Sequence, residues 1–387
     1  MNRVFRNKIM YRYESFWRES EDDPKRDSNG KRFPFPQIGN KYWTDKEQFK
    51  TKLIGVQNYL KTVKKFKKYP EQDHKNCLLC DAKNITTGSF NLNNIIWEDG
   101  LIHYIDTHNV RPTNDFIEAI YKFNPIIKGN KNNQRTIKYG SVIYKIDDMK
   151  YLKLERNQIL IMDALMKHGG YTKKYVDKKN RDVYRFSEHA GLLDFNTSGL
   201  DKLIISGKTT RVDKGDEDIY LPQNMPDAME YEYIFHTHPP TPKPGGRAKL
   251  IGILYEFPSI SDLFHFIDHY NLGTTQGSLV ITAEGMYNIR KLVFDGKKIK
   301  INEDKMYSEM QDVMRDAQRK AIDKYGTDFT PYDFYSKVTQ DREFINMLNG
   351  VLNKYKLQID YYSREKDDKG KWIIDTVHLP IYVMERK

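Results

Sequence analysis

The chain has 387 residues, a formal net charge of +11 at pH 7 and 39% hydrophobic residues, which allows two or three domains with buried cores and excludes a wholly disordered chain. Its two cysteines are too few for a disulfide framework. No apolar run approaches a membrane span, and the charged N-terminal segment lacks an apolar signal core, so we expect an intracellular protein, cytoplasmic or nuclear, with no membrane partner.

The first expected region, residues 1–70, is irregular and then helical. Prolines interrupt residues 1–45, which prevents a long helix there. Residues 46–68 carry apolar side chains at helical spacing, with Asp45 as the expected N-cap and Pro70 as the end. This pattern predicts a helix that packs one face on a core and turns a basic face to solvent.

The second region, residues 71–135, contains a Cys-x-x-Cys pair and two downstream histidines: Cys77, Cys80, His103 and His108. Two thiolates and two imidazoles supply four ligands for a tetrahedral structural zinc. A redox pair is a second interpretation, although no βαβ pattern surrounds it. Two ordinary cysteines with unrelated histidines are the third.

The spacing from Cys80 to His103 is longer than in two-cysteine, two-histidine fingers. We expect residues 95–97 and 101–104 to form a hairpin that turns at Asp99–Gly100. That hairpin would return His103 to the cysteines, as in zinc-ribbon or treble-clef modules. Such a module would stabilise the fold, bind a protein partner or contact nucleic acid.

Lysines are dense next to this module, at Lys61, Lys64, Lys65, Lys67 and Lys68. A basic excess favours acidic partners or nucleic acid in a general electrostatic sense. The basic excess of the chain as a whole is spread over several Lys-rich stretches, and no aromatic residues alternate with these lysines as in single-strand binders. A solvated basic surface is therefore the preferred interpretation, and nucleic-acid binding the weaker one.

A polar loop over 128–134 is the expected boundary before the third region, residues 150–297. There the pattern predicts a mixed sheet with helices. Strands are expected over residues 185–195, 203–206, 218–221 and 231–235, helices over 156–168 and 262–270, and a hairpin of 278–282 with 286–293. The region is assigned to the α/β class.

Two histidines end the strand over 231–235, at His236 and His238. Residues i and i+2 of a strand point to the same side, so two imidazoles lie side by side and suit a zinc ion, with Asp262 as a third ligand. Three protein ligands leave a fourth position for water, which is the layout of a catalytic zinc.

The fourth region, residues 298–387, is expected to be a mainly helical α+β extension. Helical spacing covers residues 305–325 and 334–354, and apolar runs around Tyr361, Trp372 and Val377 predict closing strands.

The order Glu188, His236-x-His238-Pro, Ser259-x-x-Asp262 resembles the signature of the JAMM (MPN-plus) zinc metallopeptidases over roughly residues 150–295. The resemblance implies an MPN-type mixed β-sheet sandwiched by helices. It also implies that His236, His238 and Asp262 hold zinc, that Glu188 is the general base, and that Ser259 hydrogen-bonds the oxyanion of the intermediate.

In that family the substrate is an amide, and commonly the lysine isopeptide of ubiquitin or a ubiquitin-like protein. A deubiquitinase-like isopeptidase is therefore the expected function. The alternatives are a non-catalytic MPN-type scaffold, an enzyme acting on a small peptide or bacterial-type amide, and a basic nucleic-acid-associated zinc protein. One departure is the long segment Pro239–Pro258, which would either form a lid or clamp or displace Asp262 and inactivate the site. The family pattern resumes intact from Pro258 to Asp262, so an active enzyme with an added loop is the expected case.

Overall fold

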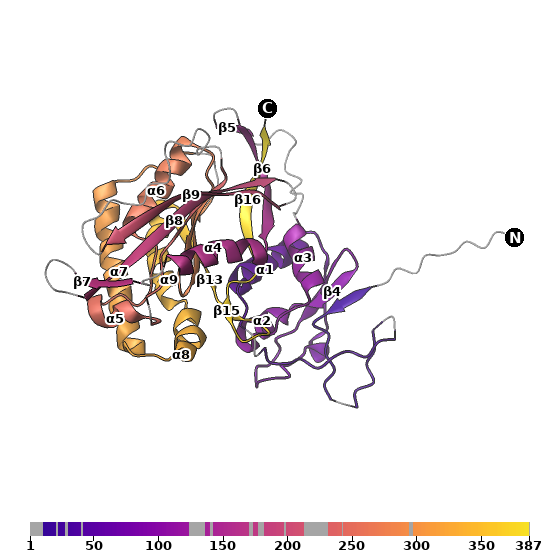
Figure 1. Ribbon diagram of the computed structural model, residues 1–387. Coiled ribbons are helices and arrows are strands. Elements are labelled where there is room, and N and C mark those ends of the chain that lie inside the picture. Colours follow the sequence, from indigo (N-terminus) through magenta and orange to yellow (C-terminus); the bar gives the residue numbers. More distant parts are fainter. Residues whose placement is uncertain are drawn as a thin grey trace. The chain divides into compact units, whose positions relative to one another are not determined.

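In a computed structural model the chain forms two compact units, residues 1–127 and 128–387 (Figure 1). The structure describes residues 11–20, 22–27, 30–39, 42–123, 136–139, 142–169, 173–176, 182–196, 199–212, 231–241, 243–293 and 297–386. The predicted loop over 128–134 and the predicted strand over 218–221 lie outside these residues. The described part is mixed α/β, which confirms the predicted class.

The first unit contains a four-stranded sheet in the order β1-β4-β3-β2. Its strands are β1 (Arg12–Glu14), β2 (Phe66–Lys68), β3 (Gly88–Leu92) and β4 (Ile95–Glu98). Strand β1 runs parallel to β4, and the other pairs are antiparallel. A strand from the irregular N-terminal region thus completes a sheet whose other members come from residues 66–98.

Three helices and a short 3-10 turn accompany this sheet: α1 (Lys46–Thr62), η1 (Glu71–Asp73), α2 (Leu101–His108) and α3 (Asn114–Lys122). Helix α1 was predicted, and its apolar stripe is buried at Phe49, Leu53, Val56 and Leu60. The helix ends six residues before the predicted limit, because Lys64 adopts a left-handed φ of 57° that no helix continues.

The predicted hairpin around Asp99–Gly100 is wrong. The hairpin joins β3 to β4 through Asn93 and Asn94, whose φ angles of 48° and 67° are those that asparagine tolerates in tight turns. The segment after Gly100 is α2. Its buried residues Leu101, Tyr104, Ile105 and His108 follow the i, i+3, i+4, i+7 spacing of a helix with one face on the core.

The second unit is built on a central sheet in the order β13-β12-β11-β10-β8-β7, with β9 paired to β8. Its strands are β7 (Lys173–Val176), β8 (Asp182–Asn196), β9 (Gly199–Val212), β10 (Tyr233–Thr237), β11 (Gly277–Ile281), β12 (Gly285–Lys291) and β13 (Leu357–Ser363). Strands β10 and β11 are parallel, and the remaining pairs are antiparallel. The predicted mixed sheet and the β11–β12 hairpin are confirmed.

Helices cover both faces of the central part of this sheet. They are α4 (Arg156–His168), α5 (Gly246–Ile251), α6 (Ile260–Leu272), α7 (Glu303–Tyr325), α8 (Pro331–Ser336) and α9 (Glu343–Leu352), with short 3-10 turns η3 (Val338–Gln340) and η4 (Asn353–Tyr355). Leu279 packs in the core of α4, and the next residue, Val280, packs in the core of α6, α7 and α9. Successive side chains of β11 point to opposite faces of the sheet, so the strand contributes to two separate hydrophobic cores.

Two smaller sheets complete the unit. Strands β5 (Thr136–Tyr139), β6 (Val142–Leu154) and β16 (Val377–Arg386) form one, and β14 (Glu365–Lys366) pairs with β15 (Trp372–Ile373) in the other. The C-terminal region contributes strand β13 to the central sheet, so residues 298–387 share the sheet of residues 150–297.

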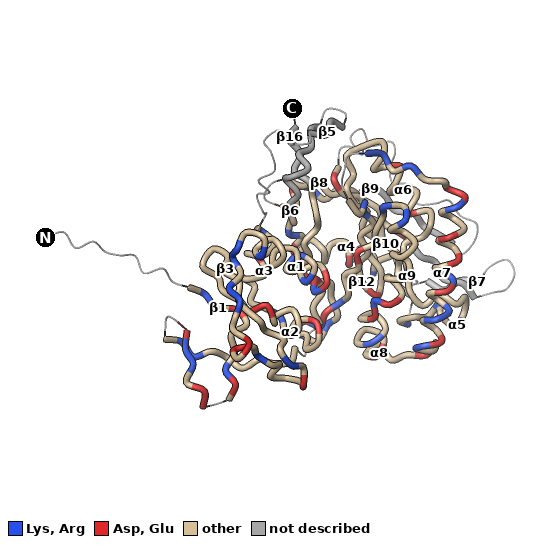
Figure 2. The backbone as a smooth tube through the Cα atoms, turned by 180° about the vertical axis from the view of Figure 1, so that it is seen from behind, with Lys and Arg blue, Asp and Glu red and all other residues tan. Residues whose placement is uncertain are grey.

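Charges of both signs are interspersed within each unit (Figure 2). On α7, for example, Asp316 pairs with Arg319 and Lys320. Intrahelical pairs of this kind belong to a solvated helix face. Among the described helices, none is both long enough and apolar enough to cross a membrane.

Candidate metal centres

The first candidate centre begins at the end of β10. His236 pairs with Val280 of β11 and with Ala190 of β8, so its side chain shares the sheet face that packs against α6. His238 follows the strand, and its backbone N–H donates to the carbonyl of Ile281 at 2.9 Å. The two Nε2 atoms lie 3.2 Å apart, as the two-residue spacing predicts.

Asp262 reaches the histidines from the first turn of α6. Its Oδ1 lies 3.3 Å from His236 Nε2, and its Oδ2 lies 3.6 Å from His238 Nε2. Ser259 is the N-cap of this helix, and the two residues bond reciprocally in a capping box. The cap therefore sets the position of the carboxylate relative to the strand end.

These three side chains fit a zinc ion. Their ligand atoms all lie within 4.8 Å of one another, and each residue is half-buried. A tetrahedral ion with Zn–N bonds of about 2.05 Å separates its ligand atoms by about 3.3 Å, close to the spacing here. His238 Nδ1 donates to the carbonyl of Glu256 at 3.3 Å, which presents Nε2 to the centre of the cluster.

The electrostatics of the cluster also suit a cation. Burial lowers the pKa of His238, but its hydrogen bond to Asp262 and the charge of that carboxylate outweigh burial and raise the pKa to about 9. Burial raises the pKa of Asp262, yet the two imidazoles hold it well below its usual value. Without a metal the cluster holds a proton on imidazole, and a cation that takes its place releases that proton.

Glu188 lies on the same side of the sheet. It is two residues before Ala190, the partner of His236, and alternate residues of a strand share a face. Its side chain is half-buried, and its charge contributes to the raised pKa of His238. The structure thus places the predicted base on the face that carries the metal-ligand cluster.

Ser259 has a structural role that the signature alone does not reveal. Its Oγ accepts the backbone N–H of Asp262 at 3.1 Å, and its own N–H donates to Asp262 Oδ2 at 2.6 Å. The cap uses a lone pair of the hydroxyl, so the O–H proton stays available to a substrate oxygen. Both functions are compatible in one side chain.

The segment Pro239–Pro258 does not displace Asp262 from the histidines. It contains α5 and then Leu254, Tyr255 and Phe257, which are buried in the α6–α7 core. The amide of Gln318 on α7 bonds the backbone of Leu254 and Tyr255 at 2.7–3.1 Å. The latter part of the segment is therefore anchored, and a gating role stays a prediction.

Sequence reasoning missed a carboxylate behind the cluster. Glu284 is buried, and its Oε1 accepts the N–H of Glu256 at 2.6 Å and the O–H of Tyr287 at 2.9 Å. Burial, and then the charge of Glu256, raise its pKa to about 7. Because the Glu256 carbonyl accepts from His238 Nδ1, Glu284 supports the candidate ligand His238 through one intervening residue. A glutamate in a hairpin turn gives no sequence signal for this role.

The second candidate centre lies in the first unit and unites the four predicted ligands. Cys77 Sγ lies 3.2 Å from His108 Nε2, and Cys80 Sγ lies 3.4 Å from His103 Nε2. All four ligand atoms lie within 4.8 Å of one another. No disulfide joins the two cysteines. Both histidines come from α2, so the expected ribbon strand carrying His103 is wrong.

Local hydrogen bonds hold these side chains in position. The N–H of Leu79 donates to Cys77 Sγ at 3.3 Å, and His103 Nδ1 lies 3.4 Å from the hydroxyl of Thr107. Burial and the neighbouring His103 lower the pKa of His108, which favours the neutral imidazole that binds metal. Two sulfur and two nitrogen ligands form the closed set of a structural zinc site.

Comparison with known proteins places this chain beside a viral relative. It is 31% identical over 318 residues to the uncharacterized protein R413 of Acanthamoeba polyphaga mimivirus. The alignment covers 78% of this chain and 85% of the relative. No family model matches the chain, and no solved structure matches it. The chain therefore belongs to the same protein family as this mimivirus protein.

Proposed function

We propose that the chain is a zinc-dependent isopeptidase of the JAMM type that removes ubiquitin or a ubiquitin-like modifier. The observation that carries the proposal is the convergence of His236, His238 and Asp262 on one side of the sheet, with Glu188 on the same face. Three of four ligand positions are supplied by protein, and a carboxylate that is not a ligand stands nearby. A scaffold has no need of that combination.

A zinc ion held by the three ligands would supply a water of lowered pKa and polarise the scissile carbonyl. Glu188 would accept the proton of the attacking water and pass it to the leaving lysine amine. The Ser259 hydroxyl would donate to the carbonyl oxygen as it gains negative charge. Because the capping box holds Ser259 and Asp262 together, the hydrogen-bond donor and a ligand keep one geometry.

We propose a structural role for the Cys/His centre. Cys77 and Cys80 lie on a loop before β3, and both histidine ligands lie on α2. A zinc ion there would join this loop to the helix across the intervening hairpin. The surface around it is the proposed docking site for a protein partner.

Zinc content tests both centres at once. Protein purified without chelator is expected to hold about two zinc ions per chain, and His236→Ala and Cys77→Ala are each expected to lose about one. His265→Ala is the matched control, because this histidine lies on α6 outside both ligand groups. A His236→Ala protein with undiminished zinc would remove the basis for the catalytic proposal.

Hydrolysis is the second part of the test. Isopeptide-linked ubiquitin conjugates and matched conjugates of ubiquitin-like proteins are incubated with wild type and with Glu188→Gln. Wild type is expected to release the modifier, and Glu188→Gln is expected to keep its zinc while losing at least about a hundredfold in rate. Normal zinc content without cleavage of any conjugate would favour the scaffold alternative.

A further inference from the structure

A cavity of about 330 Å³ opens in the second unit, and the segment that follows β10 forms part of its wall. Its walls come from the end of α4, the residues that follow β10, β11 and β13, helix α8, and the β14–β15 connection with the start of β15. The lining residues are Met166, Lys167, Pro240, Ala283, Tyr335, Arg364, Gly370, Lys371 and Trp372. Pro240 is two residues after His238, so the cavity and the metal cluster share one stretch of chain.

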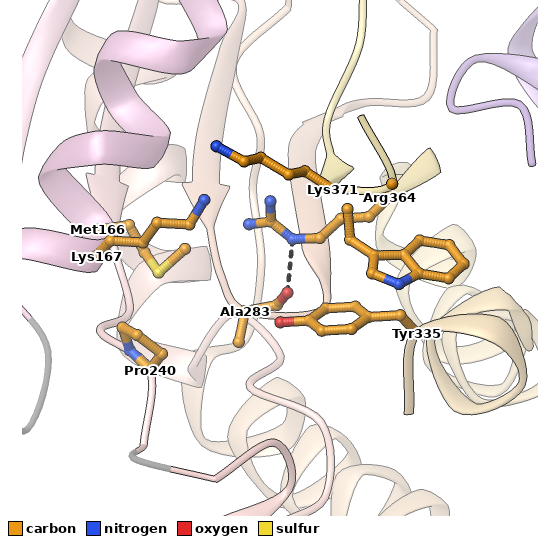
Figure 3. Close-up of a pocket in the computed structure, with 9 residues that line it drawn as sticks. Met166, Lys167, Pro240, Ala283, Tyr335, Arg364 and Lys371 are labelled. Atoms are coloured by element: carbon orange, nitrogen blue, oxygen red, sulfur yellow. Dashed lines mark hydrogen bonds between the residues drawn. The ribbon is translucent and has the colours of Figure 1, made fainter. Parts of the chain in front are cut away.

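Three cationic side chains converge on this cavity. Figure 3 shows the amino groups of Lys167 and Lys371 and the guanidinium of Arg364 lying toward one another, with Tyr335 below them. Tyr335 stacks on Trp372 with ring centroids 5.6 Å apart and planes 22° apart. The cavity is therefore a cationic recess with an aromatic wall.

The buried guanidinium of Arg364 is built into the wall but incompletely paired. Its side chain is 2% exposed. Nε donates to the carbonyl of Ala283, and Nη2 donates to Asp163 and to the carbonyl of Thr282, all at 2.6–2.7 Å. Nη1 is buried and has no hydrogen-bond partner in the described part of the chain. Arginine has five N–H donors, and this atom carries two of them.

The protein supplies less negative charge here than positive charge. Asp163 is the carboxylate that pairs with this group, and it is shared between Arg364 and Lys167 at 2.6 Å each. Lys371 adds a third cation. Three of the residues that line the recess are cations and none of them is acidic, and this excess of positive charge on the wall favours an anion.

We infer that this recess is a binding subsite for an acidic side chain of the peptide substrate, an inference that rests on the proposed function. A carboxylate is a planar acceptor that arginine N–H groups and lysine amines bind strongly. Pro240 lines the recess and lies two residues after His238, so we place the recess within reach of a side chain near the scissile bond of a bound substrate. The subsite would select acceptor lysines that have an acidic neighbour in the sequence.

Binding, measured apart from cleavage, tests this subsite. Two fluorescent lysine-containing peptides, one with glutamate and one with glutamine next to the lysine, are titrated into the full-length zinc-loaded protein and followed by anisotropy. The glutamate peptide is expected to bind about tenfold or more tightly. Lys371→Ala is expected to weaken binding of the glutamate peptide selectively, and Lys371→Glu is expected to weaken it more strongly. Lys369→Ala, an exposed lysine of the same turn outside the recess, should change nothing.

A second variant and a competitor complete the test. Arg364→Lys keeps one charge but removes the planar donor set, and its folding is checked by circular dichroism; a folded variant should lose the glutamate preference. Equal affinity of the wild-type protein for both peptides would overturn the inference. It would also be overturned if the wild-type protein bound inorganic phosphate, lost that binding in Lys371→Ala, and showed no preference for the glutamate peptide. A glutamate preference in a protein that cleaves no conjugate would sustain the subsite and refute the isopeptidase.

Discussion

Replacing Glu284 with glutamine should change how the stability of the second unit depends on pH. The Glu284 side chain is 1% exposed, and it accepts hydrogen bonds from Glu256 N–H and Tyr287 O–H. Burial, together with the charge of Glu256, raises its pKa from 4.5 to about 7. Glutamine keeps the accepting oxygen and cannot ionise.

The magnitude follows from the size of the shift. A rise from 4.5 to about 7 corresponds to about 3 kcal/mol, at about 1.36 kcal/mol per pKa unit. Between these values the folded protein holds more protons on this group than the unfolded chain, so the free energy of unfolding falls as pH rises. Above about pH 7 Glu284 is ionised in the folded protein as well as in the unfolded chain, so the whole loss of stability is present. In Glu284→Gln this fall is absent, so the variant gains up to about 3 kcal/mol relative to wild type between pH 4.5 and 8.

Urea unfolding at several pH values, in the presence of a chelator, measures this difference. Hydrogen-exchange mass spectrometry of β11–β12 peptides assigns the transition to the second unit. Glu303→Gln, which replaces an exposed carboxylate of that unit, is the control and should parallel wild type at all pH values. Parallel curves for wild type and Glu284→Gln between pH 5 and 8 would refute the reasoning.

Three further predictions follow from single contacts. Ser259→Ala removes the side-chain cap of α6. Urea titrations should show a free energy of unfolding lower by about 1 kcal/mol, and the cleavage rate should fall as well. Ser259→Thr should restore the cap and with it the lost stability. Leu53→Ala, at a fully buried position of α1, should cost about 2–5 kcal/mol, whereas Ile54→Ala, 40% exposed, should cost under about 0.5 kcal/mol; similar midpoints would contradict the assigned core face. Cys80→Ser should lower the melting temperature of the first unit and abolish its response to chelator, and a retained response would argue against zinc there.

Much of the local structure was predictable because it repeats at short range. The spacing of apolar residues predicts helices α1, α4, α6 and α7, and two apolar runs around a turn predict the β11–β12 hairpin. The helix over 101–108 has the same spacing, but the nearby Asp-Gly pair suggested a hairpin turn. The turn instead uses two asparagines, which adopt left-handed conformations at modest cost.

The candidate centres were predictable to the extent that their ligands lie close in sequence. His236 and His238 share one strand face, and Ser259 and Asp262 share the first turn of one helix. A strand period and a helix cap have fixed geometries, so residue spacing is enough to predict both pairs.

Other features depend on contacts between distant segments. Glu284 meets Glu256 because β12 and the segment before α6 pack together, and Arg364 reaches Asp163 across 201 residues. Neither residue has a spacing that marks it. The sequence by itself determined helices α1, α4, α6 and α7, the pairs of candidate metal ligands and the α/β class, because these follow from short-range periodicity. The tertiary structure alone decided which buried charges meet, because burial and its pKa shifts arise only when distant elements close around a group.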